Sequence, residues 1–443
     1  MQGIDIPKIC KNVTDFFKTT VSNVGETVLF SKRKSKINAT LFVETLMAGC
    51  LSDPTISLEG LCKLLKKRKV SITKQGLHQR FNEEATELMK VLFNQSLIQF
   101  KTESINVFNL LNQFRGLHII DSSGVSLPSL LKDLYKGHGG SGSEAALKIQ
   151  VLYDYLHGQI QQMTITESCK NDQSFDGHLN QIKGKALYLQ DLGYFKLKTF
   201  RSIIERRAYF ISRYLNPTAI FNKHGGSINL LQKLSETERF FAQEVWLDRG
   251  KKKIRVRLIA TRLSDEDIEK RIRKLKRQAQ KHGRTPTKES LEFAKWSIYI
   301  TNVPKTMLSD EQIYLVYSLR WQIELLFKLC KSEAGLDKVN GRSSNRILCE
   351  IYAKMMCVVM LLYFSSFCRW QSTTEISFLK GYKMLKLDAS DFFRSLVSPY
   401  RLLKFITEFL TDLLQFALKD KLRKKRRLAC QQLMDTVGQE ALT

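Results

Sequence analysis

The order of strand-like and helix-like patterns predicts an α/β protein with a mixed sheet between helical terminal regions. Over 106–214 the chain reads strand, strand, strand, helix, strand, helix, strand, and this order is typical of a sheet covered by helices. Residues 1–105 and 345–443 show helical periodicity instead. A further group of strand-like runs, within 215–304, interrupts the α/β order.

Apolar runs mark the elements of the first part of the sheet. We expect strands over 117–120, 146–155, 159–167, 186–190 and 208–214, and helices over 172–182 and 195–206. Gly158 stands at the turn of a hairpin. Asp121 and Asp191 each follow directly after an apolar strand-like run.

The segment 215–304 separates two parts of a core, so we expect five regions along the chain. Within it, strand-like runs over 240–248, 252–263 and 295–303 surround a basic, helix-like run over 269–284. The expected regions are a helical N-terminal region (1–105), the first part of a core (106–214), a β-rich insertion (215–304), the second part of the core (305–370) and a helical C-terminal region (371–443). The apolar stretch 355–367 is too short to span a bilayer, so we expect a buried core helix there.

The charge balance indicates a polyanionic partner. The chain carries 71 Lys and Arg against 43 Asp and Glu, a net charge of +28. Nucleic acid is the expected partner, and an anionic membrane surface is the alternative. The stretch 58–81 resembles a helix-turn-helix, which makes 1–105 a candidate DNA-binding region, although ordinary bundle packing produces the same pattern. The basic runs 251–257 and 269–284 are expected to contribute to nucleic-acid binding, and the run 419–433 is either a nucleic-acid contact or a solvated helix face.

The cysteines limit the classes of protein that the chain can represent. There are 9 of them, an odd number, and no C-x-x-C spacing occurs. This pattern disfavours a disulfide framework and a zinc finger, and it fits a reducing compartment.

The stretch "YSLRWQIELLFKLCK" (317–331) combines charged and apolar residues at helical spacing. A capping-box pattern at Ser309 and Gln312 predicts a helix that continues until Gly335. On that helix, one stripe roughly 80° wide contains Tyr317, Arg320, Glu324, Lys328 and Lys331. The opposite side contains Leu315, Leu319, Ile323, Leu326 and Cys330. The polar stripe is either a solvated face or a functional one.

Three carboxylates are candidates for a common site: Asp121, Asp191 and Glu324. Strand ends in a mixed sheet are places where sites collect, and Glu324 stands on the polar stripe. Converging carboxylates repel one another unless cations neutralise them, and Mg²⁺ favours carboxylate oxygens and phosphates. Two such ions about 4 Å apart support displacement at phosphorus. Taken singly, an aspartate after a strand is more often a turn residue.

The combination of these motifs resembles the cut-and-paste insertion-sequence transposases of the DDE class. Tyr317, Arg320, Glu324 and Lys331 match the family's YREK signature, Y-x2-R-x3-E-x6-K. The segments "IIDSSGVSLP" and "YLQDLGYF" are similar to the family's first-Asp and second-Asp segments. Trp296 precedes Glu324 at the start of a predicted strand, as does a base-stacking tryptophan in similar transposases. The resemblance covers about 115–340.

The resemblance implies a ribonuclease-H-like core that is interrupted by the insertion. The three carboxylates would bind two Mg²⁺ or Mn²⁺ ions and carry catalysis. Tyr317, Arg320 and Lys331 would hold the phosphate of the non-transferred strand, with Lys328 beside them as a further DNA contact. Trp296 would stack on a flipped base, or would simply pack in the core of the insertion.

The resemblance also implies the reaction and the partners. Hydrolysis at the transposon end would free a 3′-hydroxyl, which would attack the opposite strand to form a hairpin. Hydrolysis of the hairpin would free the 3′ ends, which would attack target DNA. The partners would be double-stranded DNA, as terminal inverted repeats and as target, and a second copy of the chain in the synaptic complex. The compartment would be the bacterial cytoplasm and nucleoid, with no membrane partner.

Two rival functions remain open at this stage. A transposase-derived DNA-binding protein would keep the fold without catalysis. A basic protein on anionic membranes would leave the three acids unexplained, and no long amphipathic anchor stands out in the sequence.

Overall fold

The computed structural model describes residues 4–30, 36–102, 110–139, 142–248, 253–339, 341–371 and 374–420. It confirms a mixed α/β protein. The chain forms two compact units. The first unit contains Met1–Leu110, Ser122–Asn171 and Trp321–Thr443, and the second contains Leu111–Asp121 and Asp172–Arg320.

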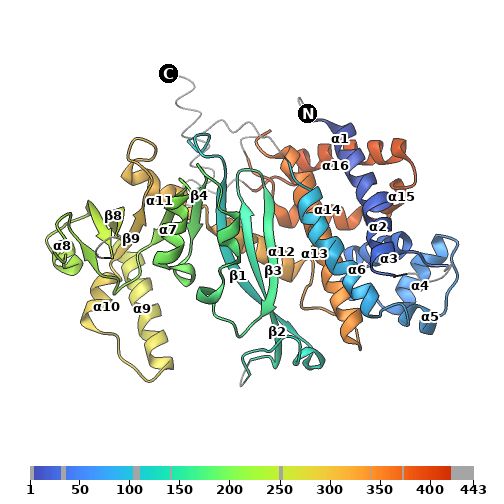
Figure 1. Ribbon diagram of the computed structural model, residues 1–443, viewed down its shortest axis with the longest axis horizontal. Coiled ribbons are helices and arrows are strands. Elements are labelled where there is room, and N and C mark those ends of the chain that lie inside the picture. Colours follow the sequence, from blue (N-terminus) through green and yellow to red (C-terminus); the bar gives the residue numbers. More distant parts are fainter. Residues whose placement is uncertain are drawn as a thin grey trace. The chain divides into compact units, whose positions relative to one another are not determined.

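Nine strands form one mixed sheet in the order β3-β2-β1-β4-β5-β9-β8-β7-β6, and β1 contributes residues to both units. The strands of the second unit are the start of β1 (Leu117–Leu127), β4 (Leu187–Gln190), β5 (Tyr209–Arg213), β6 (Ile220–Phe221), β7 (Phe240–Leu247), β8 (Ile254–Arg262) and β9 (Trp296–Thr301). β1, β4 and β5 run parallel, and β9 pairs antiparallel with β5. The strands of the expected insertion therefore continue the core sheet (Figure 1).

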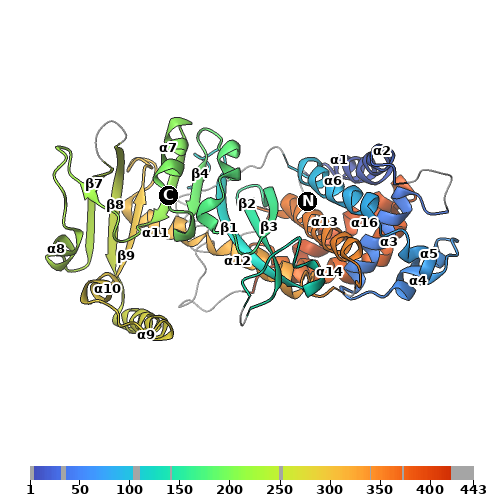
Figure 2. The ribbon, with the colours of Figure 1, turned by 60° about the horizontal axis from the view of Figure 1, so that its bottom comes forward.

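The helices of the second unit flank this sheet. They are α7 (Leu197–Glu205), α8 (Leu230–Ser235), α9 (Asp265–Lys281), α10 (Lys288–Phe293) and α11 (Asp310–Ser318). Figures 1 and 2 show α9 and α10 side by side near one end of β8 and β9. The helix expected over 172–182 is wrong, because two short 3-10 turns stand there, Asp172–Ser174 and Gly177–Gln181. Its Asn, Asp and Gly residues compete with helical hydrogen bonds and favour turns.

The first unit combines a hairpin with a bundle of helices. Its strands are the end of β1, β2 (Ala145–Asp154) and β3 (Gln159–Glu167). β2 and β3 pair antiparallel around Gly158, whose φ of 67° suits the expected turn. The helical segments are α1 (Ile6–Thr14), a π-helical turn (Asp15–Thr20), α2 (Val21–Thr27), α3 (Ala39–Ser52), α4 (Leu58–Lys67), α5 (Lys74–His78), α6 (Glu83–Gln99), α12 (Trp321–Ser332), α13 (Ser344–Cys368), α14 (Phe378–Leu387), α15 (Ala389–Ser395) and α16 (Pro399–Phe416).

Helix α13 forms the centre of this bundle. It packs against α3, α6, α14 and α16, and Figures 1 and 2 show its 25 residues among them. In the described ranges it is the one helix long and apolar enough to cross a membrane, but its most apolar window is entirely buried in the protein. The expectation of a core helix over 355–367 is confirmed.

Candidate active site

Asp121 and Asp191 are brought side by side by two neighbouring parallel strands. β1 and β4 pair in register up to Ile120 and Gln190, and each aspartate is the next residue. Adjacent strands lie about 4.8 Å apart, so the two aspartates occupy neighbouring backbone positions at this point of the sheet. Asp191 follows β4 as expected and precedes the 3-10 turn Leu192–Tyr194.

The expected end of the first strand at Asp121 is wrong. β1 continues to Leu127, so Asp121 stands within the strand. The continuation follows from the side chains after Asp121, since Val125 and Leu127 are buried while Ser126 between them is exposed. This alternation is the pattern of a strand with one face covered.

Arg320 holds Asp121 in an ion pair. Its Nη1 donates to Asp121 Oδ2 at 3.0 Å, and the two side chains are 16% and 20% exposed. The guanidinium of Arg320 therefore lies beside Asp121 and is not on a solvated surface.

The single helix expected from Ser309 to Gly335 is wrong. The capping box at Ser309 and Gln312 is confirmed, but α11 ends at Ser318 and α12 begins at Trp321. Between them, the Leu319 and Arg320 amides donate to carbonyls only three residues back, Val316 O and Tyr317 O. The tertiary contacts of the residues at the break outweigh their helical propensity, which sequence periodicity does not reveal.

Tyr317 is an internal residue of the second unit. It is 6% exposed, its hydroxyl donates to Gln190 O at 3.2 Å, and its ring lies 4.9 Å from that of Tyr299. Burial raises the pKa of Tyr317, so the phenol stays protonated and remains a donor. Tyr317 thus fixes α11 against the strand end that immediately precedes Asp191.

The third candidate carboxylate stands on α12 in the first unit. Glu324 is half-buried in the first turn of the helix, and Lys328 and Lys331 are exposed on later turns. Ile323, Leu326 and Cys330 are buried, as is Leu319 just before the helix, while Leu315 is half-buried. The separation of polar and apolar sides is therefore confirmed within α12, and the candidate carboxylates are distributed over both units.

Both ends of α12 are held by lysines of the first unit, one half-buried and one fully buried. Near its start, Lys419 Nζ donates to Gln322 Oε1 at 2.9 Å and pairs with Glu375 at 2.5 Å. Beyond its end, the fully buried Lys354 donates to Gly335 O at 2.9 Å and Lys338 O at 2.6 Å. These contacts fix the helix that presents Glu324.

Trp296 is the first residue of β9 and is 7% exposed. It lines a cavity of about 460 Å³ whose wall also contains Leu192, the residue after Asp191. Arg213, Arg271 and Lys274 line the same cavity and make it basic. Trp296 also borders a second cavity of about 600 Å³ that contains Arg262. Trp296 therefore lines two cavities of the second unit.

Sequence reasoning missed Arg213 and Arg271 as members of this site. Arg271 Nη1 donates to Trp296 O and its Nη2 to Ser297 Oγ, each at 2.9 Å. Burial lowers the pKa of Arg271, but the guanidinium remains charged. The available signals were a basic residue at a strand end and a basic helix-like run, and neither shows which cations turn toward Trp296.

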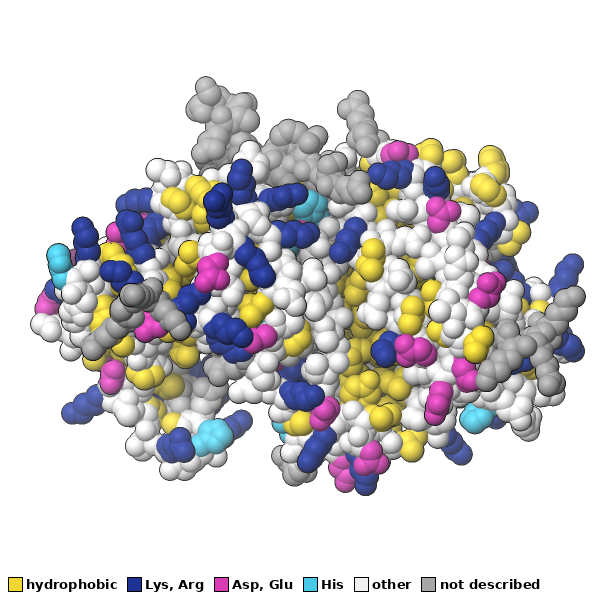
Figure 3. Space-filling view, viewed as in Figure 1, with side chains coloured by type: hydrophobic (Ala, Val, Ile, Leu, Met, Phe, Trp, Pro, Cys, Tyr) yellow, Lys and Arg dark blue, Asp and Glu magenta, His cyan; other side chains and the backbone are white. Residues whose placement is uncertain are grey.

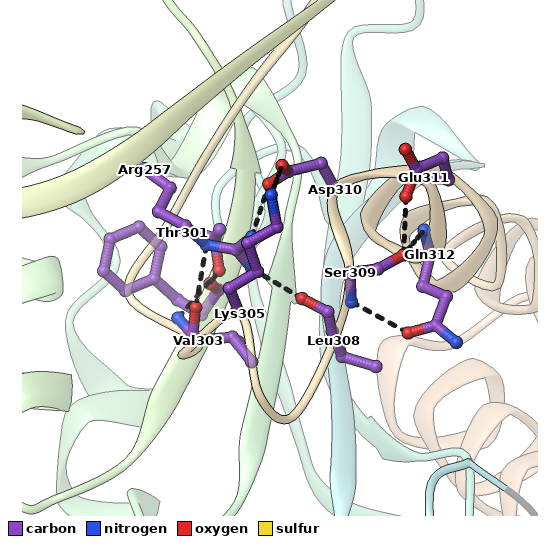
Figure 4. Close-up of polar contacts among 10 residues, drawn as sticks. Arg257, Thr301, Val303, Lys305, Leu308, Ser309, Asp310, Glu311 and Gln312 are labelled. Atoms are coloured by element: carbon purple, nitrogen blue, oxygen red, sulfur yellow. Dashed lines mark hydrogen bonds and ion pairs between the residues drawn. The ribbon is translucent and has the colours of Figure 1, made fainter. Parts of the chain in front are cut away.

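Arg257, a cation of the run 251–257, is held inside the second unit by an ion pair and two hydrogen bonds to backbone carbonyls. Figure 4 shows its guanidinium between Val303, Leu308 and Asp310. Nη1 lies 2.5 Å from Asp310 Oδ1, Nε donates to Val303 O at 3.0 Å, and Nη2 donates to Leu308 O at 2.9 Å. Lys305 Nζ lies 3.0 Å from the other Asp310 oxygen. This network fixes the first residue of α11 and so supports the helix that carries Tyr317.

Exposed cations gather elsewhere on the second unit. Figure 3 shows more Lys and Arg than acidic side chains over the part of this face where Figure 1 places α7. In the first unit, the expected helix-turn-helix segment forms α4 and α5, and Lys74 pairs with Glu59 at 2.6 Å. Its role in binding stays a prediction. Most of the run 419–433 lies outside the described residues.

Asp121 and Asp191 are the candidate donors for a divalent metal ion in the second unit. Within the described ranges, no group of three or more His, Cys, Asp and Glu side chains could hold one. The adjacent aspartates nevertheless supply the oxygen ligands that Mg²⁺ prefers, and Asp121 already accepts a cation, the guanidinium of Arg320. The chemistry of the two side chains therefore fits a divalent ion.

Paired aspartates at neighbouring strands of a mixed sheet, beside an arginine and a basic cavity, define a class of protein that processes phosphodiesters. The chain matches the family model described as "Transposase DDE domain" over residues 112–360 and belongs to this family. It is a DNA transposase of the bacterial insertion-sequence type, an enzyme that cleaves DNA strands and joins them to a target.

Relatives extend the similarity beyond the family domain. The transposase for insertion sequence element IS231F of Bacillus thuringiensis subsp. israelensis is 27% identical over 438 residues, which cover 92% of this chain and 90% of the relative. The transposase for IS1151 of Clostridium perfringens is 27% identical over 378 residues, 80% and 79% of the two chains. A piggyBac transposase in a synaptic complex with hairpin DNA has a TM-score of 0.50, with 8% identity over 95% of this chain and 87% of that chain, which supports the fold.

Proposed function

We propose that Asp121, Asp191 and Glu324 form the catalytic carboxylate triad of this transposase and hold two Mg²⁺ or Mn²⁺ ions. The observation that carries the proposal is the adjacency of Asp121 and Asp191, with Arg320 paired to Asp121. Arg320 is followed directly by α12, so Glu324 stands four residues along the chain from the partner of Asp121. The bound ions would act as Lewis acids and lower the pKa of the attacking water.

The residues of the chain supply the binding and orientation for this chemistry. Arg320 would exchange Asp121 for a phosphate oxygen of the non-transferred strand, because its planar guanidinium suits a phosphate, and this would leave the Asp121 carboxylate to hold metal. Lys328 and Lys331 are exposed point charges that hold further phosphates. Tyr317 places α11 beside Asp191 through its bond to Gln190 O, and its hydroxyl would exchange this carbonyl for an oxygen of the same phosphate.

Trp296 and the basic cavity form the second part of the DNA site. The ring of Trp296 stacks on a base flipped from the transposon end, and Arg213 and Arg271 balance the charge of the adjacent phosphates. Because Trp296 is 7% exposed, a base reaches it through one of the two cavities that it lines.

The reaction and assembly follow from these roles. Hydrolysis frees a 3′-hydroxyl at the transposon end, and this hydroxyl attacks the opposite strand to form a hairpin and displace the flanking DNA. A second hydrolysis opens the hairpin, and the freed 3′-hydroxyl attacks target DNA. Each step is an in-line displacement at phosphorus, so one site serves all of them. The partners are double-stranded terminal inverted repeats, target DNA and a second copy of the chain, in the bacterial cytoplasm and nucleoid.

The test separates catalysis from binding. Asp121→Asn, Asp191→Asn and Glu324→Gln are expected to abolish Mg²⁺-dependent cleavage of an end-containing duplex and to retain binding. Asp133→Asn is the matched control, because Asp133 is an exposed acid on the connection between β1 and β2. A variant of the triad that cleaves at the wild-type rate removes that residue from the site. Binding without any cleavage by the wild-type chain would instead favour a DNA-binding protein without catalysis.

A further inference from the structure

Helix α9 carries its charges in an uneven order. It spans Asp265–Lys281, begins at the N-cap Ser264, and has three acids in its first turn, Asp265, Glu266 and Asp267. Its cations follow at Lys270, Arg271, Arg273, Lys274, Lys276, Arg277 and Lys281. The acidic start suits the positive end of the helix dipole, but the excess of cations that follows is larger than the opposite end of the dipole requires.

The cations of the second half fall on different sides of the helix. Ile268, Ile272, Leu275 and Ala279 are the buried or half-buried residues of one face. With Lys274 at zero, Arg277 and Lys281 lie at about 300° and 340°, next to Lys274. Lys276 lies at about 200°, beside the other edge of the apolar face, and Arg273 lies at about 260°, between Lys276 and Arg277. Lys274, Arg277 and Lys281 therefore make a single exposed stripe.

Ion pairing distinguishes this stripe from the first half of the helix. Lys270 pairs with Glu266 at 2.5 Å, and Arg273 lies 3.6 Å from Glu269. In the part of the chain that the structure describes, no ion pair involves Lys274, Arg277 or Lys281, and all three are exposed. Unneutralised, aligned cations attract a polyanion more strongly than cations that already have an acidic partner.

The stripe begins at the cavity of the candidate active site. Lys274 lines that cavity together with Arg271 and Leu192, and Leu192 follows Asp191. From Lys274 to Lys281 the helix rises about 10 Å, which matches roughly three base-pair steps of a duplex. A DNA backbone that leaves the cavity along α9 would meet these cations in succession.

We propose that Lys274, Arg277 and Lys281 form a phosphate track that holds the backbone of duplex DNA beside the catalytic cavity. The inference rests on the proposed function and adds a specific binding surface to it. It divides the basic run 269–284 into a side that binds DNA and a side that does not.

The test compares two double variants with the same loss of charge on one helix. Arg277→Gln/Lys281→Gln removes two cations of the track, and Arg273→Gln/Lys276→Gln removes two exposed cations beyond it. Binding of the full chain to one end-containing duplex is measured over a salt series, with thermal unfolding as the check on folding. The single variant Arg277→Gln provides a second measurement if a double variant is unstable.

The track double variant is expected to reduce the slope of log K against log[salt] by about 2, since each lost phosphate contact lowers it by about 0.9. When the salt concentration rises threefold, the wild type would then lose about seven times more of its binding constant than the track double variant. The control double variant is expected to change the slope by less than half as much. Equal changes in the two variants, or no change in the track variant, would overturn the proposal.

Cleavage by the wild-type chain distinguishes this inference from the proposed function. If the wild type cleaves in Mg²⁺ and the two double variants bind alike, only the track is wrong. If the wild type does not cleave but the salt slopes differ as expected, the track stands and the catalytic proposal fails.

Discussion

Two arginines on strand β8 make ion pairs that should differ strongly in their contribution to stability. Arg257 and Asp310 have side chains that are 13% and 6% exposed, whereas those of Arg255 and Glu244 are 65% and 49% exposed. Both pairs have a closest N–O distance of 2.5 Å, so distance alone does not separate them. Arg257→Gln and Arg255→Gln therefore apply one chemical change to a buried and an exposed pair, two residues apart.

We expect Arg257→Gln to lower the free energy of unfolding by about 3 kcal/mol, because it leaves Asp310 buried without its arginine. This is the lower end of the usual range for breaking a buried pair, since Lys305 remains 3.0 Å from the other carboxylate oxygen. Val303 O and Leu308 O also lose their donor, which adds to the cost. Arg255→Gln is expected to leave the stability almost unchanged, because water screens an exposed pair.

The assay is urea unfolding of the full chain followed by far-UV circular dichroism, with the double variant Arg257→Gln/Asp310→Asn as the coupling measurement. The double variant is expected to cost less than the sum of its single variants, because it leaves neither charge unpaired. Equal and small shifts of the urea midpoint in Arg257→Gln and Arg255→Gln would refute the reasoning. Additive losses in the double variant would show that the two side chains act independently.

Three further predictions address the site and the bundle. Arg320→Ala should strongly reduce single-turnover cleavage in a protein that remains folded. Arg320→Lys should retain only part of the activity, because lysine lacks the planar guanidinium. Normal cleavage by Arg320→Ala would contradict the phosphate role. Ile323→Ala should cost about 2–5 kcal/mol in urea unfolding, because Ile323 is fully buried, and a cost below about 1 kcal/mol would count against its core position. Burial raises the pKa of Glu375, but Lys419 and Arg369 outweigh this effect and hold it at about 2, below the usual 4.5. Glu375 should therefore stabilise the fold above about pH 4.5 and lose this effect as the pH falls toward 2, so the difference in urea midpoint between the wild type and Glu375→Gln should shrink over that interval.

The strands were predictable from sequence because their apolar runs are long and their ends carry turn residues. The runs at 186–190 and 208–214 appear as β4 and β5, and those of the insertion as β7, β8 and β9. The apolar stretch 355–367 also identified the core of α13, since a helix segment that is apolar on all sides must be buried. The pairing of β9 with β5 was not predictable, because hydrophobic periodicity does not define which strands are neighbours.

Individual charged residues were the hardest part of the site to assign. Arg257 belongs to a basic run, yet it is an internal residue, and each of its three side-chain nitrogens donates to Asp310 or to one of two carbonyls. Arg271 also belongs to a basic run, but it turns toward Trp296. A charge run in a sequence shows how many cations are present, while burial and partners decide which of them reach a phosphate.

The break between α11 and α12 changes the meaning of the YREK spacing. On one continuous helix, Tyr317, Arg320 and Glu324 would share a stripe, and their spacing would reflect helical periodicity alone.

In the structure, Tyr317 and Arg320 belong to the unit that contains the paired aspartates, and Glu324 belongs to the other unit. Arg320 donates a hydrogen bond to Asp121 and is the last residue before α12, so only three residues separate the partner of Asp121 from Glu324 along the chain. Under the proposed triad, the spacing would set how Glu324 is presented along the chain after Arg320. An insertion of one alanine after Trp321 should then abolish cleavage by rotating Glu324 by about 100°, while an alanine inserted in the exposed loop near Gly225 should leave cleavage intact. Cleavage that survives the insertion after Trp321 would exclude this role.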